Sequence, residues 1–213
     1  MSAKVIIRSP LWSRVLIFLL LLGLALWAWY AWTFYHSVAG GADARAFENF
    51  IAFRQRFFNL LSFYLVFLVF AVAFWAYSLF ADMNNLYHDF DYRPSEAAIY
   101  AATPLLNIYG LGWMLTRLVR LFEHERLRVS YRHVIHPLKV SIAFVYAGIF
   151  GLVVSAYFAL NMPLDQISLF KAEYIGFTAI ELLLFFFTGL MFILTVYRAG
   201  AVVRLGMAHE EWR

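Results

Sequence analysis

The sequence predicts an all-α fold, a polytopic helical membrane protein with four full transmembrane helices and one broken or re-entrant segment. Of its 213 residues, 64% are hydrophobic and 14% are charged, whereas about a quarter of the residues of a soluble domain are charged. Several uncharged runs reach the length of about 20 residues that crosses a bilayer core about 30 Å thick. No segment shows the alternation of about ten residues that is typical of a membrane β-barrel. The expected spans, within a single membrane domain 1–213, are about 11–35, 57–81, 97–116 (broken), 140–163 and 174–198.

The first helix follows three cations and ends in an aromatic run, "WAWYAWTFY". Trp and Tyr gather where a membrane meets water, because their rings are amphipathic. We therefore predict an interface belt made of Trp27, Trp29, Tyr30 and Trp32. The apolar run before the belt is longer than the 7–15 residues of a signal peptide, so an uncleaved anchoring helix is expected.

The third segment contains several residues that disfavour a straight span. Pro104 removes a backbone donor and clashes with the carbonyl four residues earlier, which kinks or breaks a helix. Gly110 and Gly112 loosen the helix further, and Asn107 is a polar residue at membrane depth that needs a partner. The stretch "RPSE" ahead of the segment is expected to start its helix, with Ser95 as the N-cap.

The distribution of Lys and Arg predicts the orientation. If the third segment does not cross, thirteen of the seventeen Lys and Arg residues lie on the side of both termini and four lie on the other side. If it crosses, with five full spans, the better split is twelve to five. Cytoplasmic loops carry the excess of positive charge, so both topologies place residues 117–139 and the C-terminus in the cytoplasm. The first topology agrees better with the cations ahead of the first helix.

The fourth span carries small residues at a spacing of four, which places them on one slowly drifting helix face. Such a face lets membrane helices approach closely, either within the chain or between subunits, and predicts packing and not chemistry. The residues of this stripe are Ala143, Ala147, Gly151, Ser155 and Ala159.

Residues 70–125 resemble an uncharacterised bacterial multispan membrane-protein family, a domain of unknown function. The resemblance is carried by a Trp-x-Tyr helix end, a following Asn, a Pro-x-x-Asn helix and a later Trp. These positions are Trp75, Tyr77, Asn84 or Asn85, Pro104, Asn107 and Trp113. Gly110 stands where the family pattern has a further proline, so the resemblance does not imply a second helix break at this position. The resemblance implies a multispan bacterial protein and no activity.

Glu181 is the acidic residue that lies well inside a predicted span. A charged group at that depth is costly and suggests a functional site by default. It could carry protons, bind a cation, or act as a hydrogen-bonded packing lock. Asn107 is the expected partner if the broken segment packs beside the fifth helix.

No cofactor and no metal site are predicted. The chain has no cysteine, and its six histidines lie in loops or at the ends of spans, where buried bis-histidine haem ligation is not expected. The "HDFD" stretch reads as a solvated acidic loop. No nucleophile elbow, phosphate-binding loop, zinc-binding helix motif or dinucleotide fingerprint occurs, so an enzyme is not expected.

The segment after the broken span places leucines among arginines, as in a basic amphipathic helix lying on anionic lipids. Two alternatives are a docking surface for an acidic partner, and pairing with Asp82, Asp89, Asp91 and Glu96 of the same chain. The cations of this surface are Arg117, Arg120, Arg126, Arg128 and Arg132.

These observations predict a non-enzymatic protein of the bacterial inner membrane that acts by assembly, as an accessory or scaffold subunit of a larger complex or as a homo-oligomer. One alternative is a transporter or channel component with a polar path lined by Glu181 and Asn107. A weaker alternative is a subunit that contacts a cofactor or quinone through the aromatic belt. Lipids and other membrane subunits are the expected partners. The net charge of +4 is small for a nucleic-acid binder.

Overall fold

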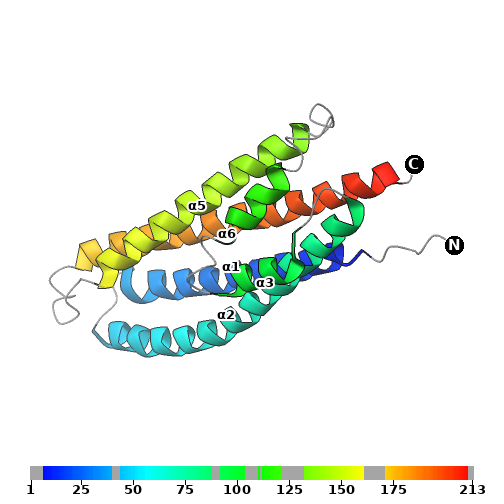
Figure 1. Ribbon diagram of the computed structural model, residues 1–213. Coiled ribbons are helices and arrows are strands. Elements are labelled where there is room, and N and C mark those ends of the chain that lie inside the picture. The colour runs from blue at the N-terminus through cyan, green and yellow to red at the C-terminus, as the bar shows by residue number, and fades with distance from the viewer. Residues whose placement is uncertain are drawn as a thin grey trace. The chain divides into compact units, whose positions relative to one another are not determined.

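Every element that the computed structural model describes is helical (Figure 1). The structure describes residues 7–39, 44–87, 92–103, 110, 112–120, 132–160 and 171–210. The helices are α1 (Ser9–Phe34), a short π-helix (Tyr35–Ala39), α2 (Ala44–Leu86), α3 (Pro94–Ala102), α5 (Arg132–Leu160) and α6 (Lys171–Glu210). Residues 112–120 form a further short helix. The predicted all-α fold is confirmed.

Four of these helices are long and apolar enough to cross a membrane, which confirms the predicted number of full spans. Among the described residues, the spans are Ser9–Ser37, Ala52–Leu86, Ile135–Val154 and Ile175–Leu205. Helices α2, α5 and α6 are longer than their spans: α2 has 43 residues, or about 64 Å at 1.5 Å per residue. The predicted third segment is not among the four.

Contacts between the helices divide the chain into two compact units. Unit 1 is Met1–Leu20, Val66–Ala143 and Met191–Arg213, and unit 2 is Leu21–Leu65 and Phe144–Leu190. Unit 1 thus collects the start of α1, the end of α2, α3, the start of α5 and the end of α6. These are the segments that the favoured topology places on the side of both termini.

The core of unit 1 is built on the end of α2. Trp75, Leu79 and Met83 are spaced four apart on one face of this helix, and all are fully buried. They form one apolar cluster with residues from α1, α3, residues 112–120, α5 and α6. The indole N–H of Trp75 donates to the hydroxyl of Ser13 at 3.1 Å, so the buried polar group of this large side chain is satisfied.

The first helix of the third segment ends just before Pro104, as predicted. Helix α3 ends at Ala102, and Thr103 has an extended backbone with φ −80° and ψ 117°. A residue before proline is driven out of the helical region by the proline ring, which explains where the helix stops. The predicted N-cap at Ser95 was wrong: the N-cap is Arg93, because Pro94 takes the first helical position that suits its fixed φ.

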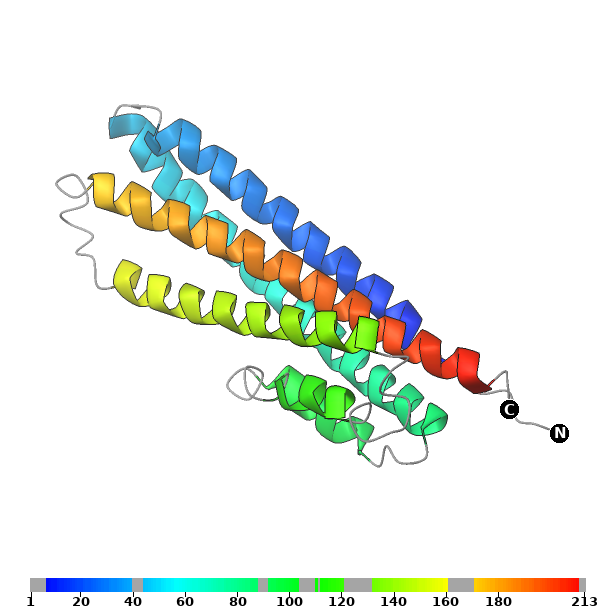
Figure 2. The same cartoon turned by 90° about the horizontal axis from the view of Figure 1, so that it is seen from above.

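Helix α3 and residues 112–120 pack side by side in opposite directions (Figures 1 and 2). A Cβ atom at Gly110 would lie 2.5 Å from the Cβ of Tyr100, and the rings of Trp113 and Tyr100 are 5.2 Å apart. Further along, Arg117 donates a hydrogen bond to the hydroxyl of Tyr92 at 3.0 Å. Later residues of the second helix therefore contact earlier residues of the first, as in two antiparallel helices. We call this pair of helices, residues 92–103 with 110 and 112–120, the hairpin.

Neither helix of the hairpin is long enough to cross a bilayer. Helix α3 has nine residues, about 14 Å at 1.5 Å per residue, against about 30 Å for the hydrocarbon core. Its buried face consists of Ala97 and Ala101, and residues 112–120 bury Met114, Leu115 and Leu118. The described residues of the hairpin therefore pack on the core of unit 1, and neither helix alone is long enough to form a fifth span.

Unit 2 contains an aromatic cluster in which α1, α2 and α6 meet. The ring of Trp27 lies 4.4 Å from that of Phe185 and 5.7 Å from that of Phe57. Tyr30 lies 4.8 Å from Phe57, one turn further along α1. Rings at these separations add to the energy of burying their area, so the cluster holds the three helices of this unit together.

Candidate functional site

Glu181 has an electrostatic partner in unit 2, the guanidinium of Arg54. The two groups attract each other, and both side chains are half-buried. The guanidinium of Arg54 also lies 5.6 Å from the centre of the Phe58 ring, a position that favours a cation. An opposite charge nearby lowers the cost of an ionised group inside a span, so the attraction of Arg54 offsets part of the cost of a carboxylate in α6.

Sequence reasoning missed Arg54 as this partner. It counted Arg54 as a loop cation ahead of a span expected at 57–81, whereas α2 begins at Ala44 and carries Arg54 inside the helix. The expected partner, Asn107, lies outside the described residues, so its pairing with Glu181 stays a prediction. The sequence did contain a signal for this partner, because Arg54 and Glu181 carry opposite charges in two apolar helices.

The pair lies near the ends of its two spans and not at their centres. Glu181 is six residues into the span Ile175–Leu205, and Arg54 is two residues into the span Ala52–Leu86. At 1.5 Å per residue, both groups lie within about 9 Å of a span end. A carboxylate and a guanidinium at this depth can also reach polar groups at the membrane surface.

The aromatic cluster of unit 2 lies one helical turn from the pair. Phe185 follows Glu181 by four positions on α6, and Phe57 follows Arg54 by three on α2. Trp27 packs against both rings and is 6% exposed. Its indole nitrogen is buried and has no hydrogen-bond partner among the described residues. A buried donor without a partner is rare, because it costs about 1–3 kcal/mol.

The predicted aromatic belt points in two directions. Trp29 and Trp32 are 50% and 67% exposed, as a belt requires. Trp27 and Tyr30 are 6% and 4% exposed and pack inside unit 2. Residues 27 and 29 are two positions apart on a helix, so they lie on opposite faces. The belt remains a prediction for Trp29 and Trp32, while Trp27 and Tyr30 hold helices together.

The small-residue stripe of α5 turns only partly towards another helix of the chain. Gly151 lies against Leu184 of α6, whereas Ala143 and Ala147 are exposed. The side chains of Ser155 and Ala159 lie outside the described residues. The closest approach in unit 2 is made by Gly148, which sequence reasoning did not single out: a Cβ there would collide with Thr188.

Asp82 is a buried carboxylate whose role sequence reasoning missed. It accepts hydrogen bonds from the backbone N–H groups of Arg8, at 3.0 and 3.2 Å, and of Ser9, at 2.6 Å. It therefore caps the start of α1 from the end of α2. Of the carboxylates expected to pair with the basic segment, Asp82 takes this backbone role, and Glu96 lies 3.9 Å from Arg93. Asp89 and Asp91 lie outside the described residues.

Arg117 is the cation of the basic surface whose contacts are best defined. Its guanidinium lies 5.1 Å from the centre of the Tyr92 ring and 5.3 Å from that of Trp113. Arg120, one turn later, is exposed. Arg126 and Arg128 lie outside the described residues, as does the side chain of Arg132 at the start of α5. The basic surface is therefore described at its first two cations only.

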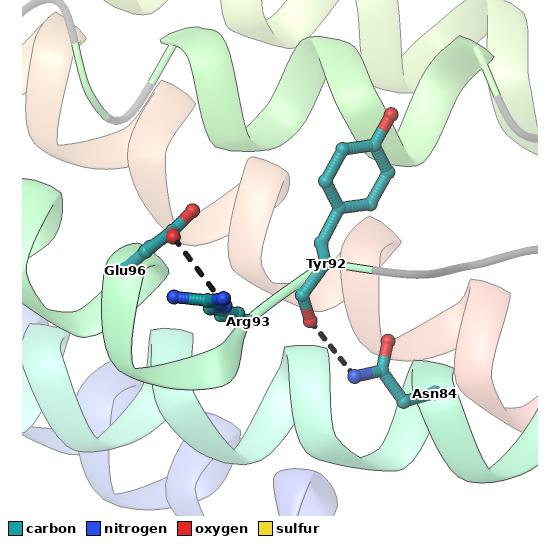
Figure 3. A network of polar contacts seen from close by, with 4 residues as sticks. All are labelled: Asn84, Tyr92, Arg93 and Glu96. Atoms are coloured by element: carbon teal, nitrogen blue, oxygen red, sulfur yellow. Dashed lines mark hydrogen bonds and ion pairs between the residues drawn. The ribbon is translucent and has the colours of Figure 1, made fainter.

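A short polar network joins the end of α2 to the start of the hairpin (Figure 3). The amide of Asn84 donates to the backbone carbonyl of Tyr92 at 2.8 Å, while the Tyr92 ring points away from Asn84. Arg93 and Glu96 face each other on the first turn of α3. Tyr92 thus has its carbonyl bound to α2 and its hydroxyl bound to Arg117, which fixes where the hairpin begins.

Among the described residues, no group of three His, Asp or Glu side chains lies close enough together to hold a metal ion. No protein-family model, curated protein or solved structure matches the chain significantly. The geometry of the two units is therefore the basis for the functional inference that follows.

Proposed function

We propose that this chain is a non-enzymatic membrane protein that acts by assembly, as a homo-oligomer or as an accessory subunit of a larger complex in the bacterial inner membrane. One observation carries the proposal: only a small share of the residues in each span is buried by the rest of the chain. Within the most apolar window of each span, 17–33% of the residues are buried. On α2, Phe63, Phe67 and Phe70 are 71%, 66% and 60% exposed.

The arrangement of the polar groups supports the same proposal. In the described part of unit 1, Asp82 is bound to the start of α1 and Trp75 is bound to Ser13. In unit 2, Glu181 and Arg54 carry opposite charges that attract each other. Polar groups that satisfy one another hold helices in register, which suits a packing subunit better than a polar path.

The mass of the extracted particle tests the proposal. After extraction with a mild detergent or directly into lipid discs, we expect a particle that contains more than one chain of 24.8 kDa, either several copies or one copy with other subunits. Mass photometry with peptide identification distinguishes these two forms. A particle that contains a single chain and no other protein, in both detergent and lipid discs, would contradict assembly.

The orientation is part of the proposal. Thirteen of the seventeen Lys and Arg residues belong to unit 1, the other four being Arg45, Arg54, Arg56 and Lys171. Positive charge accumulates on the cytoplasmic side of membrane proteins. We therefore infer that the helix ends collected in unit 1 face the cytoplasm.

A polar path through unit 2 is the second candidate. It is favoured by the indole N–H of Trp27, which is buried without a partner among the described residues. The Trp27 ring packs on Phe185, one turn from Glu181 on α6. A transported polar solute would supply the missing acceptor. In reconstituted vesicles, Glu181→Gln and Glu181→Ala should then abolish flux while expression stays normal. Flux that is equal in both variants and the unaltered protein would remove this candidate.

A further inference from the structure

Charged and apolar residues are separated along the hairpin. Arg93 and Glu96 stand in the first turn of α3, and Arg117 and Arg120 stand in the last turns of the second helix. Since the two helices run in opposite directions, these four residues meet at one end, which we call the open end. Residues 97–116 between them include no Asp, Glu, Lys or Arg.

The described part of α3 beyond the charged residues exposes an apolar side chain on one face and buries the other face. Ile99 is 59% exposed, whereas Ala97 and Ala101 on the other face of α3 are buried in the core of unit 1. Towards the open end, Tyr92 and Trp113 pack edge to face, with ring centres 5.9 Å apart. Tyr and Trp at the border between an apolar and a charged region are typical of a membrane interface.

The cations of the open end differ in what they contact. Arg117 is held by its hydrogen bond to Tyr92 and by the rings of Tyr92 and Trp113. The side chain of Arg93 is 83% exposed and only 3.9 Å from Glu96 at its nearest, and an exposed pair of this kind contributes little. Arg120 is exposed. Arg93 and Arg120 therefore present their charge outwards, while Arg117 stabilises the hairpin.

We propose that the hairpin is re-entrant, with Ile99 inside the bilayer and its open end among the headgroups, where Arg93 and Arg120 bind the phosphates of anionic lipids. Charge complementarity selects this occupant, because the guanidinium fork matches phosphate oxygens. The surface of an anionic leaflet also attracts basic groups next to a membrane segment. The inference does not depend on assembly, since a single chain would bind lipid in the same way.

The side of each end tests the re-entrant path. The chain has no cysteine, so single cysteines can be placed directly at Ser95 and Arg120, both exposed at the open end. An impermeant maleimide should label Ser95→Cys and Arg120→Cys from the same side of sealed vesicles. It should label Asn49→Cys, exposed before the α2 span, from the other side. Labelling of Ser95→Cys and Arg120→Cys from opposite sides would overturn the proposal.

The exposed residue Ile99 tests whether the hairpin enters the bilayer. A dye on Ile99→Cys should be quenched by nitroxides on lipid chains and should be inaccessible to a water-soluble quencher. The same dye on Ser95→Cys should show the opposite behaviour. Quenching of the Ile99→Cys dye from water would place the hairpin outside the membrane and contradict a re-entrant segment.

Energy transfer tests lipid selectivity. A donor dye on Ser95→Cys, in the full chain in phosphatidylcholine vesicles with some phosphatidylglycerol, reports acceptor-labelled lipids nearby. Transfer to phosphatidylglycerol should exceed transfer to phosphatidylcholine about twofold and become equal in Arg93→Gln/Arg120→Gln. Arg56→Gln, which removes an exposed charge at the other end of α2, should keep the preference. Two results would overturn the lipid site. One is equal transfer to both lipids in the protein without substitutions, as expected for a surface that binds an acidic protein. The other is a preference for phosphatidylglycerol that survives in the double variant.

Discussion

The carboxylate of Asp82 accepts a hydrogen bond from the backbone N–H of Ser9 at 2.6 Å, so a side chain near the end of α2 caps the first turn of α1. Asp82 is 2% exposed and Ser9 is fully buried. The first N–H groups of a helix have no partner within the helix and form the positive end of its dipole. A buried carboxylate satisfies both needs, which fixes the start of α1 against the end of α2 in unit 1.

Replacing this carboxylate should destabilise unit 1. We expect Asp82→Ala to lower the free energy of unfolding by about 1–3 kcal/mol, because buried N–H groups lose their acceptor. Asp82→Asn keeps one acceptor oxygen without the charge and should lose less. Thermal unfolding in mild detergent, followed by circular dichroism, measures the difference. Glu96→Ala, at an exposed carboxylate, is the control and should stay within about 0.5 kcal/mol. Equal melting of Asp82→Ala and the unaltered protein would refute the cap.

The close packing of the second hairpin helix on α3 depends on the missing side chain at Gly110. A Cβ atom there would lie 2.5 Å from the Cβ and 2.8 Å from the backbone oxygen of Tyr100. We expect Gly110→Ala to separate the two helices and to destabilise the protein by about 1–3 kcal/mol. Gly176→Ala is a matched control, because a Cβ on this α6 glycine meets nothing within 4 Å and alanine favours a helix.

The comparison of these two variants decides the point. Gly176→Ala should melt at or above the temperature of the unaltered protein, and Gly110→Ala should melt below it. Equal melting of both variants would mean that the close packing of Gly110 on Tyr100 does not contribute to stability.

Sequence patterns predicted those features that depend on neighbouring residues. The end of α3 just before Pro104 follows from the ring of one proline and the backbone of the residue before it, so it was predicted correctly. The helical class and the four long spans follow from apolar length alone. The N-cap was placed two residues late because Ser is a preferred N-cap residue. The fixed φ of Pro94 suits the first helical position, which makes Arg93 the N-cap.

Features set by distant residues were not accessible in this way. Asp82 and Ser9 are 73 residues apart, and no local pattern indicates which helix start a buried carboxylate will cap. Trp27 and Trp29 have the same side chain, and only the positions of Phe57 and Phe185 decide which of them turns inwards. The same holds for α5, where the partner helix selects Gly148 and leaves Ala147 exposed.

The close approach of α5 and α6 in unit 2 should tolerate no side chain at Gly148. A larger residue there would collide with Thr188. We expect Gly148→Leu to cost about 1–3 kcal/mol of unfolding free energy through overpacking. Ala147→Leu, at the exposed neighbouring position, should leave the stability of the single chain within about 0.5 kcal/mol. Stability in detergent, measured at a concentration where no assembly persists, checks both variants. A larger loss for Ala147→Leu than for Gly148→Leu would contradict the packing face.

The attraction between Arg54 and Glu181 should be measurable as a coupling between the two positions. Glu181→Gln leaves the Arg54 charge half-buried without its counter-charge, and Arg54→Gln does the same to Glu181. Removing both charges should therefore cost less than the sum of the single changes, by at least about 0.5 kcal/mol. Unfolding titrations of the three variants in detergent provide the double-mutant cycle.

Pairing Glu181→Gln with Arg56→Gln, at an exposed arginine two positions away on α2, gives the control cycle. That cycle should be additive, because Arg56 lies on the opposite side of the helix. Additive losses in the Arg54 cycle as well would show that Glu181 is stabilised by groups other than this guanidinium.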